Sequence, residues 1–180
     1  MKLNFQKIFA CAVLCFASFT VAAESTVIYL LRHAEKVDDS ADAALSVEGE
    51  ARAQVYADIL EDENLTAIFS TPYIRTRKTA EPTAVMHNLV IQEYDPAQPE
   101  DLIAILKTLT GTVLVTGHSN TIPELVNLLT GENMPDLDDR VYDRVYRVTL
   151  EDGLNTELSI TYTEPRTPIE SVENTRMIQR

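Results

Sequence analysis

The chain has 180 residues, of which 45% are hydrophobic and 24% charged, so its length and composition suit one globular domain and exclude a wholly disordered chain. Its formal net charge is −13, from 15 lysines and arginines against 28 aspartates and glutamates. Binding to a phosphate backbone draws its affinity from clustered cations, so we expect no nucleic-acid partner.

The N-terminal residues have the pattern of a secretory signal peptide. Lys2 and Lys7 precede an apolar run over 8–21, and small residues at Val21-Ala22-Ala23 stand where a signal peptidase cuts. An uncleaved membrane anchor is the alternative, although the apolar run is short for a membrane-spanning helix. We predict a cleaved signal peptide over 1–23.

Cleavage after Ala23 would leave a mature domain over 24–180, exported to the periplasm or the extracellular space. Both cysteines, Cys11 and Cys15, would be removed, which excludes disulfides and thiol chemistry from the mature domain. Loss of the two lysines in the signal peptide takes the net charge from −13 to −15. No second apolar stretch is long enough to span a bilayer, so we expect no membrane span after cleavage.

The first elements of the mature domain are a strand and a helix. Thr26–Leu31 is a nearly continuous apolar run with β-branched members, which predicts a strand buried on both faces. Ser46 is a suitable N-cap for a helix that runs to about Glu61. Its apolar residues fall on one helical face, which we predict to be buried: Val47, Ala51, Val55, Ile59 and Leu60.

Strands and helices continue to alternate in the middle of the chain. The apolar runs Thr66–Phe69, Leu89–Gln92 and Thr112–Thr116 predict three more strands. A helix is predicted from Pro72 to about His87, since proline suits a first helical turn, and another over Glu100–Leu109.

The last predicted elements are a helix and a hairpin. The helix covers Ile122–Leu129 and ends at Gly131, a typical C-terminal cap residue. Arg144–Leu150 and Leu154–Tyr162 alternate polar and apolar residues around Asp152-Gly153, which predicts a β-hairpin. The whole order predicts an α/β fold, a three-layer sandwich with a mostly parallel central sheet and helices on both faces.

Four basic side chains follow the predicted strands, where ligands bind in open α/β sheets. Arg32 and His33 come after the first strand, Arg75 lies in the first helical turn after the second, and His118 follows the fourth. Guanidinium groups pair bidentately with phosphate oxygens, and nearby cations lower the pKa of an imidazole and keep it nucleophilic. In-line attack by His33 would give a phosphohistidine that water later hydrolyses.

Four segments in order resemble the histidine phosphatase superfamily, also called phosphoglycerate mutase-like. Leu31–Glu35 resembles the Leu-Arg-His-Gly-Glu signature, with alanine at the usual glycine, and Leu45–Ala51 resembles a Leu-Thr-x-x-Gly-x-x-Ala helix start. Ser70–Ala80 is similar to Ser-x-x-x-Arg-x-x-x-Thr-Ala, and Val115–Ser119 to Val-x-Gly-His-Ser. The resemblance covers about residues 27 to 130 and implies a phosphoglycerate mutase-like fold.

The resemblance also implies roles for the basic residues. His33 would be the phosphorylated nucleophile, while Arg32, Arg75 and His118 would hold the phosphoryl group, with His118 also counted among the catalytic residues. Neither a metal nor an organic cofactor is implied.

A carboxylic acid in the loop after the third strand commonly protonates the leaving oxygen in this superfamily. Glu93 and Asp95 are the candidates here, and the sequence does not decide between them. The usual aromatic-glycine pattern after the acid is missing, and the chain contains no tryptophan, unlike many larger mutase-type members. The chain is therefore similar to small, minimally capped members, for which a dedicated mutase activity is less expected.

These features predict an exported, cofactor-independent phosphatase that hydrolyses phosphomonoesters through His33. The partner would be a small phosphorylated substrate or a phosphate group of the cell envelope. The missing acid motif motivates one alternative, a phosphate-binding pseudo-enzyme domain without efficient turnover.

Metal binding offers two weaker alternatives. His33, Glu35 and His118 would supply the three protein ligands of a catalytic zinc, but the neighbouring arginines argue against a cation there. The acidic residues of the loop before the hairpin do not have EF-hand spacing, so a solvated loop is preferred to a calcium site. These residues are Asp136, Asp138, Asp139 and Asp143.

Overall fold

A computed structural model describes residues 25–151 and 155–166 of the chain. The predicted signal peptide and the Asp152-Gly153 turn lie outside the described residues. None of the helices in the described part has the length and apolarity that crossing a bilayer requires.

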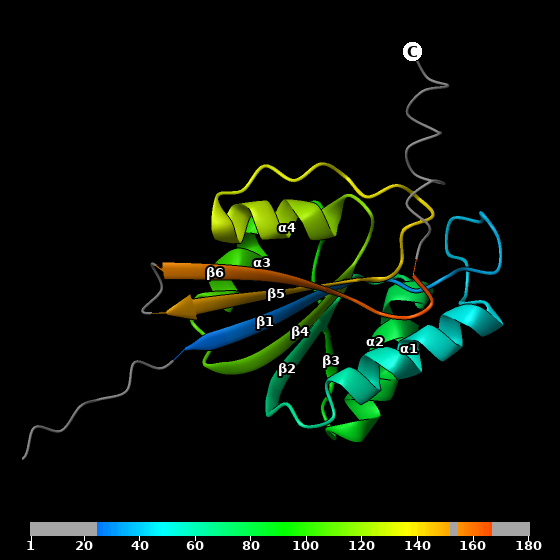
Figure 1. The fold of residues 1–180 in the computed structure, drawn as a ribbon, viewed down its shortest axis with the longest axis horizontal. Helices are drawn as coiled ribbons and strands as arrows, with labels where there is room; N and C mark the ends of the chain where they lie inside the picture. The colour runs from blue at the N-terminus through cyan, green and yellow to red at the C-terminus, as the bar shows by residue number, and fades with distance from the viewer. Residues whose placement is uncertain (1–24, 152–154, 167–180) are drawn as a thin grey trace, which may run out of the picture.

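The core of the molecule is a six-stranded sheet with the order β3-β2-β4-β1-β5-β6 (Figure 1). Its strands are β1 (Thr26–Arg32), β2 (Leu65–Ser70), β3 (Ile91–Glu93), β4 (Gly111–Gly117), β5 (Arg144–Glu151) and β6 (Asn155–Tyr162). The first four strands run parallel, whereas β5 pairs antiparallel with both β1 and β6. Both predicted strands of the hairpin are therefore present at one edge of the sheet.

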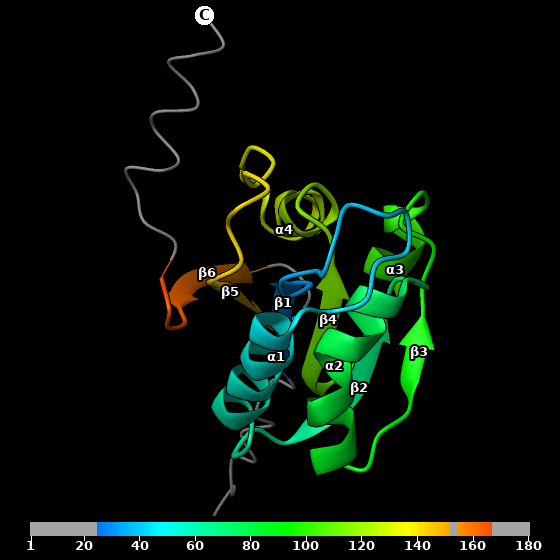
Figure 2. The same ribbon diagram turned by 90° about the vertical axis from the view of Figure 1, so that its right-hand side faces the viewer.

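Helices cover both faces of this sheet, as Figure 2 shows. The helices are α1 (Val47–Ile59), α2 (Ile74–Met86), α3 (Pro99–Leu106) and α4 (Thr121–Thr130). Helices α1 and α2 pack together on one face, and α3 and α4 lie on the other. The predicted three-layer α/β fold is confirmed.

Alternation along the central strands builds one apolar cluster on each face. In β1, Ile28 and Leu30 belong to the cluster under α3 and α4, whereas Tyr29 and Leu31 belong to the cluster under α1 and α2. All four side chains are buried, which explains why this segment reads as a continuous apolar run.

The predicted buried face of α1 is wrong except for Leu60, which is buried, although the helix and its cap are correct. Ser46 accepts a hydrogen bond from the Gly49 backbone N–H at 3.1 Å, as an N-cap should. Val47 is 79% exposed and Ile59 45% exposed. The buried stripe also has helical spacing and consists of Gly49, Arg52, Ala53, Tyr56, Ala57 and Leu60.

The reason for this difference is a polar contact and a close backbone approach. A Cβ atom added to Gly49 would lie 2.1 Å from the Glu35 backbone oxygen, so only glycine lets α1 approach this loop. Arg52 is buried because it pairs with the Glu35 carboxylate. A pattern of apolar residues could not show that an arginine and a glycine define the inner face.

The remaining boundaries differ from the prediction by a few residues. Helix α2 begins at Ile74 with Tyr73 as its N-cap residue, so Pro72 precedes the helix and does not occupy its first turn. Strand β3 has only three residues, later than predicted. Gly131 ends α4 in the left-handed conformation, with φ 76°, as expected for a C-terminal cap.

Candidate active site

The sheet register brings the predicted basic residues to one edge. Arg32, the last residue of β1, pairs with Gly117, the last residue of β4, and the His33 N–H donates to the Gly117 oxygen at 2.8 Å. His33 and His118 are therefore the first residues beyond two hydrogen-bonded strands. Strand β2 ends beside them, since the Thr71 N–H donates to the Thr116 oxygen at 3.4 Å.

A pocket of about 480 Å³ lies at this edge. Its lining contains all four basic residues that the sequence analysis selected, together with Lys36 and one carboxylate. The full lining is Arg32, His33, Lys36, Tyr73, Arg75, Pro96, Ala97, His118, Ser119, Asn120, Thr121 and Asp139. Positive charge thus collects in one hollow of an acidic protein.

His33 is buried, and one of its ring nitrogens is already engaged. Its Nδ1 lies 2.8 Å from the Ala34 backbone oxygen, and because a carbonyl oxygen only accepts, Nδ1 carries the hydrogen. The lone pair of the neutral ring is therefore on Nε2. Burial, reinforced by the charge of Arg32 and Arg75, lowers the pKa of His33 to about 3, so the imidazole is neutral at physiological pH.

His118 faces His33, with ring centroids 5.5 Å apart. Its Nε2 lies 3.0 Å from the Thr71 hydroxyl, and its Nδ1 lies 3.4 Å from Arg75 Nη2. Since arginine only donates, Nδ1 accepts and Nε2 carries the hydrogen. Burial, followed by the charges of Arg75 and Arg32, lowers the pKa of His118 to about 4.

Arg32 is only 3% exposed, and the loop before β5 holds its guanidinium in place. Its Nη1 donates to the backbone oxygens of Asp138 at 3.0 Å and Val141 at 2.8 Å. Its Nη2 lies 3.5 Å from an Asp139 carboxylate oxygen, and its buried Nε has no hydrogen-bond partner among the described residues. One edge of the guanidinium is thus fixed, while Nε and Nη2 retain capacity for an anion.

Arg75 is half-buried in the first turn of α2. Its Nη1 donates to the Ala41 backbone oxygen at 3.0 Å, and its Nη2 reaches His118. The guanidinium carbon lies 4.5 Å from the centroid of the Tyr73 ring, which is within the range of a cation–π contact.

Two tyrosines support the basic residues, and the sequence analysis missed both. The Tyr73 ring packs edge-on against His118 with centroids 4.9 Å apart. The Tyr142 ring lies 4.2 Å from the Arg32 guanidinium carbon and 6.0 Å, centroid to centroid, from His33. Tyr73 stands two residues before Arg75, and this proximity in the sequence could have identified it. Tyr142 comes from a distant loop that no local pattern links to the site.

The two predicted proton donors do not line the described pocket. Glu93 is half exposed at the edge strand β3, and it accepts from Arg77 Nη1 at 2.7 Å. The Asp95 carboxylate accepts from the Ala97 backbone N–H at 2.9 Å within its own turn. Their loop reaches the pocket through Pro96 and Ala97 instead.

The Glu35 side chain forms an ion pair with Arg52 of α1. Its carboxylate receives Arg52 Nε at 2.8 and 3.0 Å and Arg52 Nη2 at 2.7 Å. The zinc arrangement of His33, Glu35 and His118 is not assembled, since Glu35 is absent from the pocket lining. No group of three or more potential metal-ligating residues occurs in the described part of the chain, which includes the acidic loop before β5.

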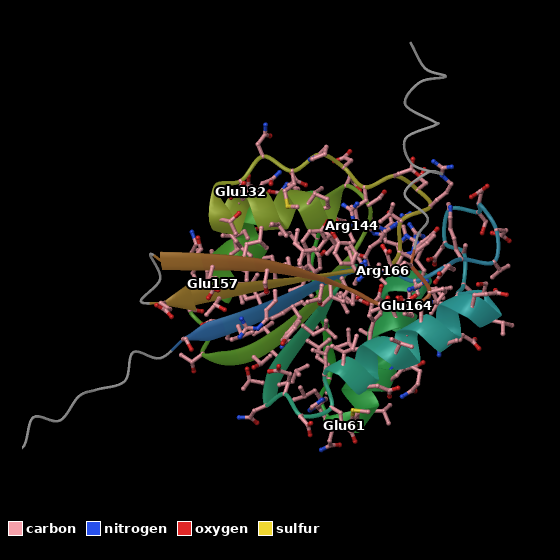
Figure 3. All side chains as sticks on the ribbon, viewed as in Figure 1. Glu61, Glu132, Arg144, Glu157, Glu164 and Arg166 are labelled. Carbon is pink, nitrogen blue, oxygen red and sulfur yellow. The ribbon has the colours of Figure 1, made fainter. Side chains whose placement is uncertain are left out.

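Arg52 also binds the segment that follows β6. Its Nη1 donates to the Thr163 hydroxyl at 2.8 Å, and its Nη2 to the Pro165 backbone oxygen at 3.1 Å. Figure 3 shows this segment, labelled at Glu164 and Arg166, near the end of the sheet where α1 begins. A buried guanidinium thereby joins the His33 loop, α1 and the last described residues.

Comparisons with known proteins agree with this arrangement. The family model of the histidine phosphatase superfamily (branch 1) matches residues 28–97, which contain three of the four segments quoted above. No curated protein matches the sequence.

Solved structures share the fold at low sequence identity. The protein histidine phosphatase SixA complexed with tungstate superposes with a TM-score of 0.63 and 20% identity, over 76% of this chain and 96% of that one. A phosphoglycerate mutase from Bacillus anthracis superposes with a TM-score of 0.61 and 14% identity, over 78% of this chain and 93% of that one. A mycobacterial glucosyl-3-phosphoglycerate phosphatase superposes with a TM-score of 0.60 and 14% identity, over 77% of this chain and 98% of that one.

The architecture is thus the phosphoglycerate mutase-like α/β fold, with a basic pocket beyond the carboxyl ends of its parallel strands. The family model supports, over residues 28–97, the resemblance to the histidine phosphatase superfamily that the sequence motifs indicate. A phosphatase-type enzyme is the class that the family model supports.

Proposed function

We propose that this protein is an exported phosphatase that hydrolyses phosphomonoesters through a phosphohistidine on His33. The observation that carries the proposal is the state of this side chain: a buried, neutral imidazole whose Nδ1–H is held by Ala34, so that the lone pair of Nε2 is available in a cationic pocket. An imidazole in this state is a nucleophile without further activation.

The neighbouring residues have the chemistry to bind the phosphoryl group. Arg32 and Arg75 would neutralise its charge. The Nε of Arg32, unpartnered among the described residues, and its Nη2, which has only a 3.5 Å contact with Asp139, suit two phosphate oxygens. His118 lines the same pocket, and its Nε2 hydrogen would serve a third phosphate oxygen once it exchanges the Thr71 hydroxyl for the substrate. Catalysis of this kind depends on positioning and on charge stabilisation in the transition state.

The substrate class in this proposal is a small phosphomonoester or a phosphate group of the cell envelope. The pocket is open and polar, and its lining includes short side chains such as Ala97, Ser119 and Asn120, which leave the rim of the pocket uncrowded. No large insertion follows β3, because only five residues separate β3 from α3. A broad range of leaving groups suits such a rim better than one small metabolite does.

Export is the part of the proposal that depends on the sequence alone. The signal-peptide pattern over 1–23 supports it, and the mature domain would then act outside the cytoplasm.

Hydrolysis of p-nitrophenyl phosphate by the purified protein, with EDTA present, tests the activity. We expect turnover that survives EDTA and is lost in His33→Ala. The variants Glu93→Gln and Asp95→Asn, measured beside it, test the two acids predicted from the sequence. Absence of turnover in the folded wild-type protein would contradict the proposal.

The second candidate function is a phosphate-binding domain without efficient turnover. The observation that favours it is the position of Glu93 and Asp95, neither of which lines the described pocket. Such a domain would bind vanadate or phosphate with the same residues but release no product. Binding without turnover would therefore favour this candidate over the phosphatase.

A further inference from the structure

The described pocket contains a single carboxylate among its lining residues, and it comes from an unexpected loop. Asp139 belongs to the segment between α4 and β5, which is distant in sequence from the loop after β3. One of its oxygens lies 3.5 Å from Arg32 Nη2 and 3.4 Å from the Ser119 hydroxyl. We infer that Asp139 is the proton donor to the leaving oxygen, an inference that rests on the proposed phosphatase activity.

The loop that carries Asp139 is fastened to the site from both sides. Arg32 Nη1 holds the backbone oxygens of Asp138 and Val141, which flank Asp139 on either side. The Leu137 N–H donates to the Ser119 backbone oxygen at 2.8 Å. The backbone around Asp139 is thus fixed by the same arginine that would bind the phosphoryl group.

The side chain of Asp139 itself is free to reorient, since it is 92% exposed and its two contacts are long. This differs from Glu93, which has a 2.7 Å ion pair with Arg77, and from Asp95, which closes its own turn. A proton donor needs to reach a leaving oxygen bound in the pocket, which Asp139 lines. Of the three carboxylates, Asp139 is the one positioned there.

Substrate binding would also change the electrostatics around this carboxylate. Arg32 is the cationic partner of Asp139 in the structure. A bound phosphoryl dianion takes over that guanidinium and places negative charge beside Asp139. A neighbouring like charge favours the protonated form of a carboxyl group, which is the form that a general acid needs.

The two chemical steps then balance. In the first, the Nε2 lone pair of His33 forms a bond to phosphorus, the ester P–O bond breaks, and the leaving oxygen takes the proton from Asp139. In the second, the Asp139 carboxylate accepts a proton from water while the water oxygen bonds to phosphorus. The P–N bond breaks, its electron pair returns to Nε2, and inorganic phosphate leaves.

The dependence on the leaving group tests this role. We would measure kcat/KM of the wild type and Asp139→Asn for dinitrophenyl phosphate, whose leaving oxygen needs no proton, and for phenyl phosphate, whose leaving oxygen does. Asp139→Asn should lose on the order of 100-fold or more with phenyl phosphate and little with dinitrophenyl phosphate. Asp139→Glu should restore part of the loss.

Two controls keep the result specific. Glu93→Gln and Asp95→Asn should leave the ratio between the two substrates unchanged, and Asp139→Asn should still form the phosphorylated protein from dinitrophenyl phosphate. An equal loss of Asp139→Asn on both substrates, no loss on either, or a changed ratio in Glu93→Gln or Asp95→Asn, would overturn the inference. A wild-type protein that is never phosphorylated would instead refute the phosphatase proposal itself.

Discussion

His33 is buried, and its tautomer leaves the lone pair of the ring on one defined nitrogen. The Ala34 oxygen holds the Nδ1 hydrogen, which directs the lone pair of the neutral ring to Nε2. Burial and the two arginines then disfavour protonation of that nitrogen. The same loop therefore fixes both the orientation and the charge state of the proposed nucleophile.

The lowered pKa values of His33 and His118 predict a loss of stability in mild acid. Above about pH 6.5 both imidazoles are neutral whether the chain is folded or unfolded. Below it the unfolded chain gains protons that the folded site, with pKa values of about 3 and 4, does not bind. The free energy of unfolding should therefore fall by about 1 kcal/mol per imidazole for each pH unit below 6.5.

Urea denaturation at two pH values, in buffer without phosphate, measures this loss. His33→Gln should show a smaller decrease than the wild type, because it removes one of the two groups. A decrease of equal size in His33→Gln would contradict the lowered pKa of His33.

At the scale of elements, the carboxyl ends of β1, β2 and β4 position the site, and α1 fixes the loop that follows β1. The α1 contact is unusual because its inner face is built around a glycine and an arginine. Each of these two residues carries a prediction.

Gly49→Ala should destabilise the protein. The new Cβ would lie 2.1 Å from the Glu35 oxygen, and backbone on both sides leaves little room to yield. We expect a loss of about 1–3 kcal/mol, as for other overpacked positions. Glu50→Ala, one residue further along the same helix and exposed, is the matched control. Thermal unfolding of the two variants makes the comparison, and a stable Gly49→Ala would contradict the close approach.

Arg52→Met should cost about 2–4 kcal/mol, because it leaves the Glu35 carboxylate, which is only 24% exposed, without its partner. Glu35→Gln combined with Arg52→Met should recover part of this loss, since the uncompensated charge is then gone. A double-mutant cycle by urea denaturation measures the coupling. Strictly additive single and double variants would show that the ion pair contributes nothing.

The sequence predicted the elements best where one physical signal dominates. Apolar β-branched runs located all four parallel strands, and the strand ends located Arg32, His33, Arg75 and His118 in one pocket. The inner face of α1 was not predictable from apolar residues, because a buried ion pair determines it.

Residues from the loop before β5 also escaped prediction. Asp139 lines the pocket, and Tyr142 contacts Arg32 and His33, only because β5 lies beside β1 and because Arg32 binds the loop backbone. Nothing local in an acidic loop distinguishes Asp139 from Asp136 or Asp138. This contact between distant segments depends on the sheet order, which the sequence pattern did not specify.

At the scale of the whole molecule, a basic pocket stands in a chain of net charge −13, which becomes −15 if the signal peptide is cleaved. The overall charge repels large polyanions at long range, whereas the pocket attracts a small dianion at short range. Small phosphomonoesters fit this combination better than nucleic acids do.

Export makes a prediction at this scale. Expressed with its full N-terminus in a bacterial host with a secretion pathway, the protein should be recovered outside the cytoplasm and begin at Glu24. Intact-mass spectrometry of the secreted fraction checks the cleavage site. Recovery of the uncleaved chain in the membrane fraction would instead support the anchor alternative.

The most direct test of the central claim is the site of phosphorylation. The purified protein would be mixed with dinitrophenyl phosphate, quenched within one turnover at alkaline pH, and mapped by mass spectrometry under conditions that preserve phosphohistidine. We predict a phosphoryl group on His33 that disappears as inorganic phosphate is released, and none in His33→Ala. Turnover with the phosphoryl group on another residue, or no phosphorylated protein at all, would contradict the account.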